Sequence, residues 1–180
     1  MPLGDHIKPW SGDAYRHLPK SASIDPFDFN RCGKSTENRW NMTGEPTLYL
    51  ASSKAVALGE YARHLDTTRS AGVRGGIRPR TVVRYSLSLT EALDLHDLEV
   101  CRELGFGEGP EVFVQDVDKA RVVGAFVRRV TGAQGLIVPS MAFLDSYTMN
   151  WNLVLFLEKL VPDQRAFILS ATPDGGFAVA

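Results

Sequence analysis

Cysteine is scarce in this sequence, with only Cys32 and Cys101 among 180 residues. Two isolated thiols do not suit a small secreted domain held together by disulfides. They favour a reducing compartment, so we expect a cytoplasmic protein, while a disulfide between the two stays open. Apolar runs are short, and none approaches the roughly 20 residues that a membrane-spanning helix needs. Residues 1–6 are polar and lack the apolar core of a signal peptide, so we expect no membrane contact.

A charge imbalance is also missing. The chain has 20 basic and 21 acidic residues, for a formal net charge of -1 at pH 7. Neither this balance nor any recognition motif indicates direct binding of nucleic acid. The four histidines have no paired metal-ligand spacing, so we expect no metal site. Ser140 stands outside a Gly-x-Ser-x-Gly elbow and has no convincing His/Asp pair, which argues against a serine nucleophile.

Length and composition fit one globular domain. Hydrophobic residues make up 44% and charged residues 23% of the chain, which argues against disorder. A chain of this length buries roughly 70% of its unfolded surface, so it needs no metal or disulfide to fold. We find no internal repeat. We expect a single domain over residues 1–180, with a loose N-terminal arm over residues 1–13.

Short apolar runs and helical periodicities mark the expected elements. We predict strands over residues 47–51, 83–89, 92–95, 135–140, 152–157 and 166–170, and helices over 54–65, 97–104 and 116–131. Residues 17–38 and 66–80 are rich in turn-forming residues, and we predict loops there. Strands outnumber helices and occur in mixed order. This indicates an α+β fold with a mixed, largely antiparallel sheet and few helices.

The most informative local feature is Arg39-Trp40-Asn41, which precedes the apolar strand at 47–51. Guanidinium groups suit phosphate and pyrophosphate, because they donate two parallel hydrogen bonds and stay charged. Trp40 and Tyr49 could form a flat wall for a ring. Taken singly, arginines are usually surface residues and such aromatics are more often part of the core. As a group, these residues suggest a site for an anionic ligand that carries a ring.

Three polar residues elsewhere are further candidates. Glu60 follows on the predicted helix, where its position alone favours a solvated face; the functional alternative is a carboxylate at a pocket wall that stabilises a developing positive charge. Ser140 ends a buried strand, where it could also be a turn residue or a helix cap. Asn152 opens a strand, and its surroundings in the sequence do not decide its role.

These residues belong to blocks that occur in a recognisable order. The blocks are Tyr15-Arg16, Asn38-Arg39-Trp40-Asn41 with Gly44, and residues 48–51, 57–60, 135–140 and 152–156. Together they resemble the RES domain, a family named for an Arg, a Glu and a Ser. The resemblance runs from about residue 15 to residue 156. One departure is Glu37-Asn38, where the family commonly has Gly before Arg-Trp-Asn.

The resemblance implies a fold similar to that of ADP-ribosyltransferase toxins and a bacterial toxin that consumes NAD. The expected reaction is cleavage of the nicotinamide–ribose bond by hydrolysis or phosphorolysis. A protein ADP-ribosyltransferase and a non-catalytic nucleotide-binding module are the alternatives. The implied catalytic residues are Glu60, Arg39 and Ser140, and the implied ligand-binding residues are Arg16, Tyr49, Trp40 and Asn152.

The resemblance also bears on partners. NAD is expected as substrate, with no bound cofactor. The expected protein partner is an antitoxin with an Xre-type helix-turn-helix domain, or an immunity protein, and a homodimer is also plausible. Such a toxin would act in the bacterial cytosol, either as a free-standing protein or after delivery as an effector.

Overall fold

The computed structural model describes residues 2–20, 25–36, 38–70, 77–107, 109–146 and 148–177. The described strands are β1 (Lys8–Pro19), β2 (Thr47–Ala51), β3 (Arg80–Asp94), β4 (Gly135–Pro139), β5 (Trp151–Phe156) and β6 (Ile168–Phe177). Their order in the sheet is β1-β2-β5-β4-β3-β6, and β1 also pairs with β3. Only the β3–β4 pairing is parallel among the pairings of these described strands. The predicted α+β fold with a largely antiparallel sheet is confirmed.

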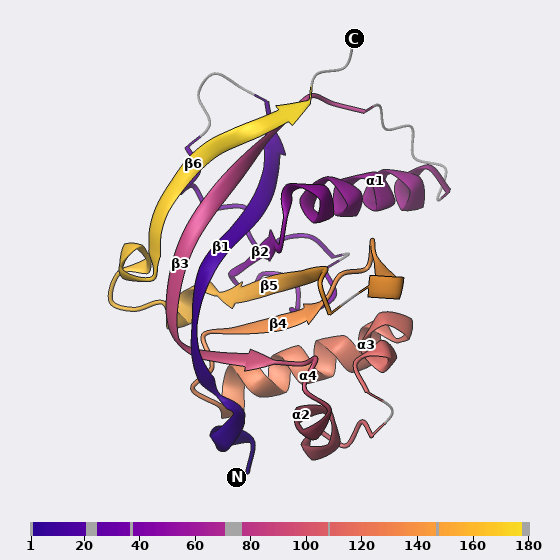
Figure 1. Cartoon of the computed structure of the whole chain (residues 1–180), viewed down its shortest axis with the longest axis vertical. Helices are drawn as coiled ribbons and strands as arrows, with labels where there is room; N and C mark the ends of the chain where they lie inside the picture. Colours follow the sequence, from indigo (N-terminus) through magenta and orange to yellow (C-terminus); the bar gives the residue numbers. More distant parts are fainter. Residues whose placement is uncertain are drawn as a thin grey trace.

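The sheet has two halves that meet at an angle. In Figure 1 the long strands β1, β3 and β6 curve side by side, and the short strands β2, β5 and β4 run across them. A single pair, Tyr15 and Ala51, joins β1 to β2, while Ala92 to Asp94 of β3 join β4. The two halves therefore pack against one shared core, which holds residues of β1, β3 and β6 together with residues of β2, β4 and β5.

The alternation of side chains along the strands builds two cores. In β4, Ile137 packs between the two halves of the sheet, while Leu136 and Val138 pack on the opposite face. In β5, Leu153 packs between the halves and Val154 lies on the opposite face. Successive strand residues point to opposite faces, so a strand covered on both sides is apolar throughout. This explains why all of β4 is buried and why its apolar run was recognisable in the sequence.

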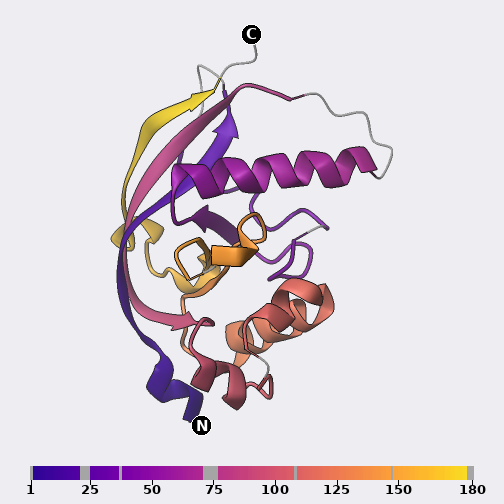
Figure 2. The same ribbon diagram turned by 45° about the vertical axis from the view of Figure 1, so that its right-hand side comes forward.

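In the described part of the chain, four α-helices flank this sheet: α1 (Lys54–Ser70), α2 (Leu98–Glu103), α3 (Glu111–Gln115) and α4 (Val117–Val130). Short 3₁₀ helices are η1 (Pro2–His6), η2 (Leu144–Ser146), η3 (Leu157–Lys159) and η4 (Gln164–Ala166). Figure 2 shows α1 across one end of the molecule, whereas α2, α3 and α4 gather at the other end, near the N-terminus. None of the helices in the described part of the chain has the length and apolar character needed to cross a membrane.

Local interactions fix where two of the helices begin. The Ser53 hydroxyl accepts a hydrogen bond from the Val56 amide at 3.2 Å and caps the start of α1. The Asp116 side chain accepts hydrogen bonds from the amides of residues 118 and 119 and begins α4. Within α4, Gly124 lies against the backbone of Trp40, whose carbonyl oxygen would be 2.3 Å from a Cβ at that position. α4 thereby fixes the position of the Arg39-Trp40-Asn41 segment.

The prediction of a loose arm over residues 1–13 is wrong. Residues 2–6 form η1, and Leu3 is buried in the core beneath α4. Residues 8–13 belong to β1, which pairs with β3 from Lys8 to Pro19. The arm was mispredicted because most side chains of this part of β1 are exposed, so the apolar alternation that marks a strand is lacking.

Other boundaries also differ from those predicted. Residues 17–19, predicted as loop, complete β1, and residues 66–70 continue α1. The strands predicted at 83–89 and 92–95 are one strand, β3; the last strand begins at residue 168, after η4; and α3 was not predicted. Residues 71–76 of the predicted arginine-containing loop lie outside the described residues. Cys32 and Cys101 are both buried and free, so they form no disulfide.

Candidate active site

A cleft of about 530 Å³ lies between α1, β1 and the ends of β2, β4 and β5. This volume falls within the roughly 300–1,000 Å³ typical of ligand pockets. Six of the seven predicted site residues line it: Arg16, Arg39, Trp40, Tyr49, Glu60 and Asn152. Among the described residues lining the cleft, four are arginines and one, Glu60, is an acid. The cleft therefore favours an anionic ligand and offers one carboxylate.

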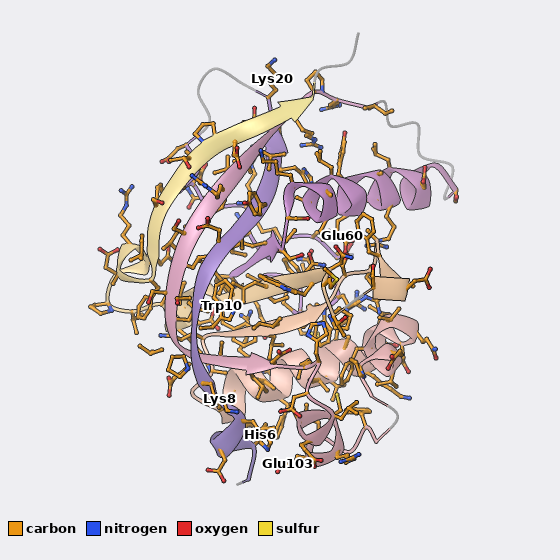
Figure 3. All side chains as sticks on the ribbon, viewed as in Figure 1. His6, Lys8, Trp10, Lys20, Glu60 and Glu103 are labelled. Carbon is orange, nitrogen blue, oxygen red and sulfur yellow. The ribbon has the colours of Figure 1, made fainter. Side chains whose placement is uncertain are left out.

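Glu60 projects from α1 toward the start of β5 (Figure 3), where four donors converge on its Oε1 atom. Ser140 Oγ donates at 2.8 Å and Asn152 Nδ2 at 2.9 Å. The backbone amides of Met141 and Ala142 donate at 2.8 and 3.3 Å. Hydrogen bonds to a charged acceptor are stronger than neutral ones, so this arrangement holds the carboxylate in one orientation.

The second oxygen of Glu60 has a different environment. Its Oε2 atom accepts a hydrogen bond from Arg63 Nε at 3.1 Å, and the Glu60 side chain remains 20% exposed. Burial acts to raise the pKa of Glu60, but the hydrogen bonds from Asn152, Ser140 and Arg63 outweigh it and leave that pKa below its usual value. Glu60 is therefore ionised at neutral pH.

Ser140 is completely buried behind Glu60. Its hydroxyl donates to Glu60 and accepts a hydrogen bond from the Ala142 amide at 3.2 Å. The structure places it against Glu60. Asn152, which lies opposite Ala51 in the β2–β5 pairing, acts on the same oxygen.

The three residues of Arg39-Trp40-Asn41 occupy different environments. Arg39 lines the cleft, and its Nη1 donates to the Phe113 carbonyl of α3 at 2.8 Å. Burial and the nearby Arg63 cation lower the pKa of Arg39 from its usual value. Trp40 is only 4% exposed, and its ring packs edge-on against Phe113 with centroids 5.5 Å apart. Most of the Trp40 side chain is therefore core, the alternative that the sequence had left open.

Tyr49 connects this segment to β2. Its hydroxyl accepts a hydrogen bond from the Trp40 amide at 3.0 Å and donates to Asn41 Oδ1 at 2.8 Å. Burial raises the pKa of Tyr49, so the phenol stays protonated and can donate. Asn41 in turn donates to the carbonyls of Met42 and Gly33, at 2.6 and 3.2 Å. Asn41 thus stabilises the turn that presents Arg39 to the cleft.

The sequence matches the RES domain family over residues 13–174. The chain belongs to the RES domain family. No curated protein matches it. Among solved structures, it resembles a chain of the crystal structure of the M. tuberculosis MbcT–MbcA toxin–antitoxin complex, with a TM-score of 0.59. The two are 16% identical, and the match covers 97% of this chain and 87% of that chain, so the likeness concerns the fold.

The RES blocks, spread along the sequence, meet at this cleft. Arg16 comes from β1, Arg39 from the segment before β2, Glu60 from α1 and Asn152 from β5. Arg16 Nη1 is buried and has no hydrogen-bond partner among the described residues. Of the Glu37-Asn38 pair, where the RES family commonly has Gly before Arg-Trp-Asn, Glu37 lies outside the described residues. The neighbouring Asn38 carbonyl accepts a hydrogen bond from Arg121 of α4 at 3.1 Å.

Sequence reasoning missed three cleft residues of the RES domain: His17, Arg63 and Arg80. The rings of His17 and Tyr61 have centroids 4.9 Å apart, and the Arg80 guanidinium lies 4.1 Å from the Tyr61 ring centroid. Burial and the Arg80 and Arg16 cations lower the pKa of His17 to about 4, so its imidazole is neutral. Helical spacing from Glu60 could have indicated Arg63. His17 and Arg80 come together only through the pairing of β1 with β3.

Proposed function

We propose that this RES-domain protein cleaves the bond between nicotinamide and ribose in NAD. The observation that carries the proposal is the environment of Glu60. One of its oxygens is held by four donors, the other accepts a hydrogen bond from Arg63, and the surrounding cleft is rich in arginine. A carboxylate fixed in this way suits a reaction in which positive charge develops on the ligand.

The chemistry of NAD explains why one carboxylate is enough. Nicotinamide is bonded to ribose as a pyridinium and takes the bonding electron pair when it leaves, so it departs as a neutral molecule. The departing group needs no proton, in contrast to the sugar oxygen that glycosidases protonate with a second carboxyl group. The ribose becomes oxocarbenium-like in the transition state. Glu60 can accept a hydrogen bond from a ribose hydroxyl and offset that charge.

The arginines provide the complementary contacts to the rest of the ligand. Arg16 and Arg39 would bind the pyrophosphate, whose paired oxygens match the guanidinium donors. Tyr49 lines the cleft, and its ring would shape the space for nicotinamide. Ser140 and Asn152 would act through Glu60, since both donate to the same carboxylate oxygen.

The acceptor of the ADP-ribosyl group completes the reaction. Water would yield ADP-ribose, nicotinamide and a proton, and inorganic phosphate would yield ADP-ribose phosphorylated at the anomeric carbon. Either reaction would deplete NAD, which supports a toxic role. The fold likeness to a chain from a toxin–antitoxin complex also supports a toxin with an antitoxin or immunity partner. Expression should then arrest growth, and co-expression of the adjacent gene's product should relieve the arrest.

The direct test follows nicotinamide release from NAD by the pure protein, with and without phosphate. We expect release by the native chain and a loss of about a hundredfold in kcat for Glu60→Gln, because losing one transition-state charge contact costs about 3 kcal/mol. Glu99→Gln makes the same chemical change on the exposed surface and should leave the rate unchanged. No release under either condition would refute NAD cleavage. NAD binding by calorimetry without turnover would instead favour a binding module, and transfer of label to protein would favour an ADP-ribosyltransferase.

A further inference from the structure

Gly59 stands in the middle of α1, next to Glu60, and lies close to the segment that follows β4. A Cβ built on Gly59 would be 2.7 Å from Cε2 of Phe143 and 3.2 Å from Cβ of Ala142. Glycine is otherwise an unfavourable residue in a helix interior, because it loses the most backbone freedom there. The close approach of the 140–143 segment is a physical reason for glycine at this position.

The same segment holds the Glu60 carboxylate. The Ser140 hydroxyl and the Met141 and Ala142 amides all donate to Oε1. Phe143 packs against the small cluster of buried residues that includes Val56 and Ala57 of α1. The segment is therefore anchored to α1 by Phe143 on one side and bonded to Glu60 on the other.

We propose that Gly59 is a positioning residue: the missing side chain lets the 140–143 segment approach α1 closely enough for its donors to reach Glu60. The inference concerns the carboxylate itself, and its catalytic consequence rests on the proposed NAD cleavage. A methyl group at position 59 would push against the Phe143 ring and the Ala142 methyl. The ring is partly exposed and can turn, whereas Ala142 can move only with its backbone.

The Ala142 amide is the donor that such a displacement would affect first. Its distance to Oε1 is 3.3 Å, already at the long end for an N–H···O hydrogen bond. The other titratable groups that interact with Glu60 are Arg63 on the same helix, Arg39 before β2 and the neutral His17 of β1. None of these residues is among the nearest neighbours of a Cβ at position 59. Their effect on the pKa of Glu60 should therefore be the same in the native chain and in Gly59→Ala.

The test is Gly59→Ala, with the Glu60 carboxyl followed by ¹³C NMR titration and assigned by its absence in Glu60→Gln. Losing part of the donor set should raise the pKa of Glu60 by about half a unit or more. The midpoint of the acidic limb of the kcat–pH profile should move to higher pH by the same amount. At neutral pH, kcat should fall about tenfold with KM nearly unchanged. Thermal stability should not fall correspondingly, since alanine is the better helix former.

A matched control and a rescue variant sharpen this test. Gly132→Ala also brings a Cβ close to another atom, Glu91 Oε1 at 2.8 Å, but that atom ends a flexible, exposed side chain away from the cleft. It should change neither the titration of Glu60 nor kcat. Combining Gly59→Ala with Ala142→Gly moves the methyl from one side of the contact to the other, and should restore both.

The outcomes separate this inference from the proposed function. A native Glu60 titration in a folded Gly59→Ala chain would overturn the positioning role, whatever the activity. A raised pKa of Glu60, with no nicotinamide release even by the native chain, would support the positioning role and refute NAD cleavage. Should Gly59→Ala not fold, Phe143→Leu loosens the same contact from the other side. It should then raise the pKa of Glu60, and an unchanged titration would overturn the inference.

Discussion

Removing the Ser140 hydroxyl tests whether this buried serine acts on Glu60 or on the ligand. Ser140→Ala deletes one of the four donors to Glu60 Oε1 and leaves those from Asn152, Met141 and Ala142. It creates no steric conflict, because the change only removes an atom. The hydroxyl is inaccessible in the native chain, so bound NAD would not touch it.

The structure sets the expected size of the effect. A hydrogen bond to a charged group contributes about 1.5–3 kcal/mol, and the remaining donors favour the lower end of this range. One pKa unit corresponds to about 1.4 kcal/mol, so the pKa of Glu60 should rise by about one unit. Because that pKa starts below its usual value, Glu60 stays ionised at pH 7. The rate loss should therefore come from looser positioning, about tenfold in kcat, with KM for NAD nearly unchanged.

The same change should alter how stability depends on pH. The folded-state pKa of Glu60 is lowered, so its stabilising contribution is present above the unfolded-state pKa, whose ordinary value is 4.5. That contribution is lost as the pH falls through the folded-state value. Ser140→Ala reduces it, so the loss in free energy of unfolding should be larger at pH 7 than at pH 3.

Two assays check these expectations for Ser140→Ala. Initial rates over a range of NAD concentrations give kcat and KM, and urea unfolding at pH 7 and pH 3 gives the free energies. Ser88→Ala, which removes an exposed hydroxyl from β3, is the control. A raised KM with native kcat would refute the reasoning, since it would mean that Ser140 contacts bound NAD. Native values of both constants would show that the fourth donor is dispensable.

Two further predictions concern the walls of the cleft. Tyr49→Phe removes the hydroxyl that joins the Trp40 amide to Asn41 and leaves both without this partner. It should lower the free energy of unfolding by about 1–3 kcal/mol in urea titrations, and an unchanged value would contradict the bridging role. His17 has a folded-state pKa of about 4 against an ordinary value of 6.5, so the folded state resists its protonation. The contribution of neutral His17 to the free energy of unfolding should be complete above pH 6.5. It should be lost as the pH falls toward 4, and the total loss should be about 3 kcal/mol. His17→Phe should remove this part of the slope between pH 7.5 and 4.5, and an unaltered slope would assign the loss to other groups.

The success of the sequence predictions follows the degree of burial. β2 and β4 have continuous apolar runs, and α4 has a clear periodicity, so their positions were close to those observed. Residues 8–13 of β1 have mostly exposed side chains and were mistaken for an arm, and residues 17–19 were mistaken for a loop. β1 forms through its pairing with β3, because backbone hydrogen bonds to a distant strand do not depend on apolar alternation in its own sequence.

By itself, the sequence determined the family and most of the charged groups of the site, because the blocks around Arg16, Arg39, Glu60 and Ser140 keep their order along the chain. It did not determine which of these groups form hydrogen bonds with one another. Ser140 and Asn152 are 80 and 92 residues from Glu60, yet both donate to one oxygen. Only the tertiary structure decided that Ser140 is enclosed, that Trp40 is mainly core and that His17 and Arg80 meet at Tyr61. The physical reason is that burial and hydrogen-bond geometry arise where strands and helices distant in sequence pack together.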